Sequence, residues 1–129
     1  MQIALIAQDD KKELMTQLCI AYCGILAKHT LCSTATTGRF IAEATGLDIE
    51  LVLPGAGGGT EQIASRIAYD EIDLLLYFRD ATDRFDSPDA ELVQLCDTYN
   101  IPLATNLATA EALILSLDRG DLDWRKNIK

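Results

Sequence analysis

The sequence is short of basic residues, of histidine and of long hydrophobic segments, and each shortage excludes a class of protein. Its 129 residues include 11 lysines and arginines against 20 aspartates and glutamates, which gives a formal net charge of −9. Such an acidic surface repels nucleic acid and anionic lipid. No hydrophobic run reaches the roughly 18 residues of a membrane-spanning helix, and the N-terminus lacks the pattern of a signal peptide. We therefore expect a cytoplasmic protein that binds neither nucleic acid nor membranes.

The four cysteines show no metal-binding or redox pattern, because the chain has no Cys-x-x-Cys pair and only one histidine. Cys19 and Cys23 lie four residues apart on one face of a predicted helix, where buried thiols are far commoner than zinc ligands. We expect no metal and no cofactor. His29 precedes a predicted strand, at its amino end, and is interpreted as structural.

Strand-like and helix-like segments alternate along the whole chain. Hydrophobic residues make up 49% of the sequence, enough for a single globular domain over residues 1–129. Strands are predicted near 2–7, 30–34, 49–53, 72–78 and 101–105, and helices near 10–28, 37–45, 60–70, 88–99 and 107–117. Because the strand at 72–78 is almost continuously hydrophobic, the sheet should be covered on both faces. This predicts a three-layer α/β/α, Rossmann-like fold with a central parallel five-stranded sheet.

Three strand-to-helix junctions carry residues suited to binding a phosphate. They are Asp9-Asp10-Lys11-Lys12, Thr34-Ala35-Thr36-Thr37-Gly38 and the glycine-rich stretch from Pro54 to Thr60. Hydroxyls, backbone N–H groups and the positive end of a helix all favour an anion. Since ligands of parallel sheets bind at the carboxyl ends of the strands, the junctions predict one composite anion site.

Each junction also has a structural explanation. Asp9 and Asp10 are natural N-cap residues, and Thr36 and Thr37 could cap the following helix. The three consecutive glycines fit a flexible loop as well as a backbone nest. Lys12 lies one turn into a helix, where the dipole disfavours a cation unless an anion lies in front of it. Lys12 is therefore either a phosphate ligand or a solvated surface lysine.

Two further acidic positions follow the strand at 72–78. Asp80 stands at the carboxyl end of that strand, a typical position for chemistry, although a structural pair with Arg79 is the alternative. Ser87-Pro88-Asp89 is fully explained as an N-cap, a first-turn proline and an acid favoured by the helix dipole.

Taken in this order, these segments resemble the methylglyoxal synthase family, lyases that eliminate phosphate from dihydroxyacetone phosphate. The resemblance covers nearly the whole chain, including Ile3–Ala7, Thr34–Gly38, Phe78–Asp80 and Asn100–Asn106. It implies a homohexamer with substrate or phosphate ligands at Gln8, Lys12, Thr34, Thr36, Thr37, Gly38, Gly55, Gly58 and Gly59. It implies active-site positions at Asp9, Thr60, Glu61, Asp80, Asp86 and Asp89.

The chain departs from the family at the residues that would perform the reaction. Thr60 stands where the family has a catalytic aspartate, and Gln8 and Asp86 stand where it has histidines. The reaction needs a base and an electrophile. Glu61 is a candidate replacement base, but lies about 100° around the helix axis from the family position, and Asp86 would be an electrophile only when protonated.

We therefore expect a protein that binds phosphate or a small phosphorylated metabolite and has weak or lost lyase activity. The alternative is an active methylglyoxal synthase with reassigned carboxylates. Hydrophobic residues all round the first helix, including Ile20, Ile25 and Leu26, predict self-assembly. Trp124 is expected to pack on its own subunit or a neighbour.

Overall fold

The computed structural model describes residues 1–52, 59–80 and 89–127 of the chain. Five parallel strands form one sheet in the order β3-β2-β1-β4-β5. They are β1 (Gln2–Ala7), β2 (Thr30–Thr34), β3 (Ile49–Val52), β4 (Leu74–Phe78) and β5 (Leu103–Ala104). The predicted five-stranded parallel α/β fold is confirmed.

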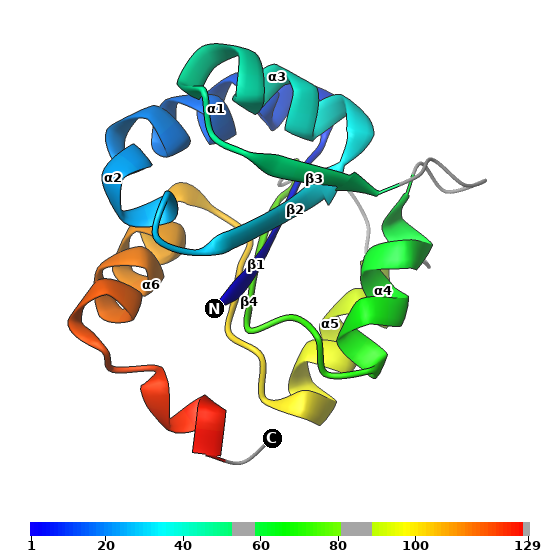
Figure 1. The fold of residues 1–129 in the computed structure, drawn as a ribbon. Coiled ribbons are helices and arrows are strands. Elements are labelled where there is room, and N and C mark those ends of the chain that lie inside the picture. The colour runs from blue at the N-terminus through cyan, green and yellow to red at the C-terminus, as the bar shows by residue number, and fades with distance from the viewer. Residues whose placement is uncertain (53–58, 81–88, 128–129) are drawn as a thin grey trace.

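Helices cover both faces of the sheet (Figure 1). They are α1 (Lys12–Ala21), α2 (Cys23–Leu26), α3 (Ala35–Thr45), α4 (Thr60–Ala68), α5 (Asp89–Tyr99) and α6 (Leu107–Arg119), with 3-10 turns η1 (Asp9–Lys11) and η2 (Asp123–Asn127). Side chains alternate across a strand, so Ile3 and Leu5 of β1 pack in the core formed with α1, α2, α3 and α6. Ala4 and Ile6 pack in the second core, formed with α4 and α5.

Two predicted segments are shorter than expected, for local reasons. The helix predicted over 10–28 is interrupted at Tyr22, whose φ of −111° and ψ of 25° lie outside the helical region; Gly24, two residues further on, has low helix propensity. Strand β5 begins only at Leu103, because Pro102 has no N–H to donate to the ladder, although its carbonyl accepts from Leu75 N at 3.0 Å.

The C-terminal segment is held to the end of α5 and to the turn before β4 by a buried arginine that sequence reasoning did not find. The Arg125 side chain is 1% exposed, and its guanidinium donates to the backbone carbonyls of Tyr99 and Asn100 at the end of α5. It also lies 3.6 Å from an Asp70 carboxylate oxygen and 3.7 Å from one of Asp73. Trp124 beside it remains 47% exposed.

The exposed hydrophobic side chains bear on the expectation of self-assembly. Ile20 is 53% and Phe40 49% exposed, whereas Leu26 is completely buried in the chain's own core. Leu26 therefore offers no surface for assembly, and the prediction is wrong for this residue. Within the three described ranges, no helix combines the length and hydrophobicity that crossing a bilayer requires.

Candidate functional site

The strand order changes direction at β1, whose neighbours are β2 on one side and β4 on the other. The backbone N–H of Gln8, the first residue after β1, donates to Phe78 O at 2.9 Å. The Gln8 side-chain oxygen in turn accepts from the backbone N–H of Asp80 at 2.6 Å. Gln8 therefore ties the carboxyl ends of β1 and β4 together at the position where ligands of such sheets bind.

Lys12 points back from the start of α1 toward the end of β1. Its ammonium nitrogen donates to Ala7 O at 3.2 Å and lies 2.5 Å from the Asp9 carboxylate. The Lys12 side chain is 13% exposed and that of Asp9 is fully exposed. The hydrogen bond from Lys12, together with its charge, lowers the pKa of the Asp9 carboxyl below its ordinary value. An anion approaching Lys12 would compete with Asp9.

Thr37 connects the second junction to Ala7, the last residue of β1, which Lys12 also contacts. Its hydroxyl is buried and lies 3.3 Å from Ala7 O and 3.4 Å from Ala7 N. Helix α3 begins at Ala35, with Thr34 as its N-cap and no capping bond from the Thr34 side chain. Neither Thr36 nor Thr37 caps the helix, so the capping alternative is wrong. Thr37 instead fixes the first turn of α3 to the end of β1, and Thr36 is exposed.

Gly38 lies in close contact with two neighbouring strands. A methyl group at this position would overlap the Leu51 side chain on β3 and lie 3.1 Å from Ser33 Cβ on β2. Absence of a side chain lets α3 pack directly on the two strands. Its place beside the threonines is thus explained without a ligand.

The first junction does not form the predicted helix cap either. Gln8 is the N-cap of η1, and Asp9 and Asp10 lie within that turn, so neither aspartate caps a helix. The 3-10 turn ends at Lys11, and α1 follows directly.

The third junction is described only in part. Gly59 is buried with a φ of 100° and precedes Thr60, where α4 begins. Thr60 is half-buried and Glu61, in the first turn, is exposed. Gly55, Gly58 and Asp86 lie outside the described residues, and of Asp89 only its position at the start of α5 is described.

At the carboxyl edge the structure therefore brings together Gln8, Asp9, Lys12, Thr37 and Asp80. Gln8, Lys12 and Thr37 meet through direct bonds to the backbone of residues 7 and 80. Their roles toward a ligand stay predictions.

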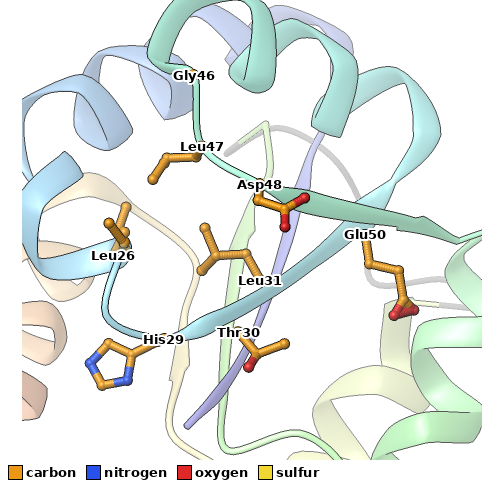
Figure 2. Close-up of a pocket in the computed structure, with 9 residues that line it drawn as sticks. Leu26, His29, Thr30, Leu31, Gly46, Leu47, Asp48 and Glu50 are labelled. Atoms are coloured by element: carbon orange, nitrogen blue, oxygen red, sulfur yellow. The ribbon is translucent and has the colours of Figure 1, made fainter.

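A cavity of about 640 Å³ lies at the opposite, amino edge of the sheet. Figure 2 shows His29, Asp48 and Glu50 around it, with Leu26, Leu31 and Leu47 as its apolar lining. Glu50 pairs with Arg66, which lowers the pKa of the Glu50 carboxyl. Burial, and then the charge of the N-terminus, lower the pKa of His29, which favours its neutral form. With two carboxylates and a neutral imidazole, this cavity disfavours an anion.

The cysteines have the environment of core side chains. Burial raises the pKa of the Cys19 and Cys96 thiols to about 12, so neither is a thiolate at neutral pH. Cys23 is half-buried. In the part of the chain that the structure describes, no three His, Cys, Asp or Glu side chains gather in a way that could hold a metal ion.

A parallel sheet covered by helices on both faces, with the strand order changing direction at β1, defines a Rossmann-like α/β protein. The profile of the MGS-like domain matches residues 18–105. The chain belongs to the methylglyoxal synthase family.

Individual relatives match over nearly the full chain. The methylglyoxal synthase of Caldicellulosiruptor saccharolyticus is 59% identical over 128 residues, which cover 98% of this chain and 91% of that protein. That of Thermoanaerobacterium thermosaccharolyticum is 48% identical, with 100% and 98% covered. The crystal structure of methylglyoxal synthase from Elizabethkingia anophelis NUHP1 superposes with a TM-score of 0.80 at 36% identity, covering 88% of this chain and 76% of that one.

Proposed function

We propose that this protein binds inorganic phosphate or a small phosphorylated metabolite of the dihydroxyacetone phosphate class, with weak or lost lyase activity. The observation that carries the proposal is the convergence of Lys12, Thr37 and the first turn of α3 on the carboxyl end of β1. A cation and a helix N-terminus directed at one point favour a phosphate.

Lys12 is the central phosphate ligand of the proposal. An ammonium group has three donors, and two of them are directed at Ala7 O and Asp9. A phosphate would displace the exposed Asp9 carboxylate, while the bond to Ala7 O keeps the ammonium in place. The first N–H groups of α3 have no partners within the helix and supply further donors.

The missing base limits the chemistry at this site. Forming methylglyoxal from dihydroxyacetone phosphate requires removal of a carbon-bound proton, stabilisation of the enediolate oxygen and departure of phosphate. At neutral pH the Thr60 hydroxyl cannot accept a proton, and the Gln8 carboxamide can donate a hydrogen bond but cannot transfer a proton. We therefore expect the protein to bind the phosphorylated ligand without converting it efficiently to methylglyoxal.

An active methylglyoxal synthase is the second candidate. It is favoured by the methylglyoxal synthases that are 47–59% identical to this chain over nearly its whole length. In that case Asp80, Asp9, Asp89 or Glu61 would have to replace the base, and Glu61 follows Thr60 directly in the first turn of α4.

The test is a calorimetric titration of the purified protein with inorganic phosphate, combined with an assay for methylglyoxal after addition of dihydroxyacetone phosphate. We expect saturable phosphate binding and methylglyoxal formation close to the rate without protein. Absence of phosphate binding would contradict the proposed site, and rapid turnover would select the second candidate.

We also propose, from the family resemblance, that the protein is cytoplasmic and forms a homohexamer. The exposed side chains of Ile20 and Phe40 support self-assembly. Light scattering at micromolar concentration tests this, and a monomer would reject it.

A further inference from the structure

We propose a second anion site, separate from the phosphate site, at the carboxyl ends of β4 and β5. A cavity of about 380 Å³ lies there between α1, β4 and the start of α6. Its polar lining consists of Lys11, Arg79, Thr105 and Asn106, and Leu14 and Leu107 form apolar walls. The ligand class is a small organic anion, a carboxylate or a phosphate ester.

The charges around this cavity are unusual for the chain. Two of the chain's 11 basic residues line the cavity, and none of the aspartates and glutamates within residues 1–52, 59–80 and 89–127 does, although acidic residues outnumber basic ones 20 to 11 in the full sequence. The cavity at the amino edge has the opposite character, since Asp48 and Glu50 line it. In a protein with a net charge of −9, a concave region with two cations attracts anions locally against the overall field.

The neutral lining adds hydrogen-bond donors. Thr105 and Asn106 connect β5 to α6, and the Asn106 side-chain oxygen caps that helix by accepting from Thr109 N at 3.1 Å. Because the oxygen is used in the cap, the NH2 group of Asn106 provides its donors. The 13-residue helix α6 begins at Leu107 in the cavity wall, so its positive end adds to the two cations.

Adjacent lysines serve the two sites. Lys12 turns to Ala7 O and Asp9 and does not line this cavity, whereas Lys11 lines it. Lys11 and Lys12 are therefore assigned to different proposed sites. Arg79, which follows β4, offers a planar guanidinium that matches carboxylate and phosphate oxygens in pairs.

The size and the apolar walls indicate an organic ligand. A volume of about 380 Å³ falls in the range of small-molecule sites and exceeds what an inorganic ion fills. Leu14 and Leu107 would contact the carbon portion of the ligand while Lys11 and Arg79 hold its charged end.

The experiment is a set of calorimetric titrations of the full chain with succinate, with glycerol 3-phosphate and with inorganic phosphate. Succinate probes a carboxylate ligand and glycerol 3-phosphate a phosphate ester. We expect at least one organic anion to bind in an event that Lys11→Ala weakens at least about tenfold, as loss of one charged hydrogen bond does. Lys12→Ala should leave that event unchanged, and Lys28→Ala, at the amino edge, is the matched control.

Arg79→Gln provides a second variant with the same expected loss of organic-anion binding, and thermal unfolding of each variant checks the fold. The inference is overturned if neither organic anion binds at millimolar concentration. It is also overturned if the binding is insensitive to Lys11→Ala and Arg79→Gln, or is lost equally in Lys12→Ala. Failure of the phosphate site appears differently, as inorganic phosphate binding that Lys12→Ala does not change.

Discussion

The carboxylate of Asp9 lies 2.5 Å from the ammonium nitrogen of Lys12, one helical turn further along the chain. The pair lowers the pKa of Asp9, so its contribution to stability is present above the ordinary pKa of about 4 and is lost as the pH falls through the lowered pKa. An NMR titration of the Asp9 carboxyl carbon should give a pKa below the ordinary value. Lys12→Ala should return it to that value, and Lys28→Ala should leave it lowered; an unshifted pKa in the parent would contradict the pairing.

Lys12→Ala should weaken phosphate binding by about 1.5 to 3 kcal/mol, the range for a hydrogen bond to a charged group. The side chain is 13% exposed and fixed by Ala7 O, so little rotamer entropy is lost when an anion binds. Calorimetric titration with phosphate measures the change, with Lys28→Ala as the control for loss of one charge. Equal affinities for parent and Lys12→Ala would remove Lys12 from the site.

Gly38→Ala should destabilise the protein by about 1 to 3 kcal/mol, because the added methyl group overlaps the Leu51 side chain and either that side chain or α3 must shift. Gly24→Ala is the matched control, since nothing lies within 4 Å of its new methyl group. In α2 that change should stabilise by about 0.5 to 1 kcal/mol. Urea unfolding compares the two, and equal effects would mean that the tight contact at Gly38 is absent in solution.

Arg125→Ala should lower the free energy of unfolding by about 3 kcal/mol, because it leaves the buried Asp73 carboxylate without its cation. Arg119→Ala is the control, as the exposed pair of Arg119 with Asp121 is worth about 0 to 1 kcal/mol. Chemical denaturation of both variants measures the difference. A loss at Arg125 no larger than at Arg119 would show that the C-terminal segment is not anchored by this side chain.

Sequence patterns predicted the parallel sheet, because continuous hydrophobic strands alternating with helices leave few arrangements, and the candidate site residues follow its strands at the carboxyl ends. They did not predict which backbone atoms the polar side chains would bind. Thr37 has the local sequence of a capping residue, yet its hydroxyl contacts Ala7, 30 residues away in the chain. Gln8 likewise bonds the backbone of Asp80 across 72 residues. Such contacts depend on strand order, which local patterns do not contain.

Arg125 was missed for a related reason. It stands in a polar C-terminal stretch whose composition is typical of a solvated tail, and arginine is seldom fully buried. Only the folded chain brings Asp70, Asp73 and the end of α5 around it. An isolated hydrophobic residue beside it, Trp124, was the one signal that this tail packs on the domain.

We propose that this chain binds phosphate but lacks an efficient base for the lyase reaction. A kinetic assay compares the initial rate of methylglyoxal formation from dihydroxyacetone phosphate between the parent and Thr60→Asp, alone and with Asp86→His. A positioned general base contributes about 10² to 10⁴-fold, so the parent should be slower than ordinary enzymes by at least about 10²-fold, and the double variant should be faster than the parent. A parent rate of about 1 to 10³ per second would contradict the account and show that another carboxylate, with Glu61 the first candidate, serves as the base.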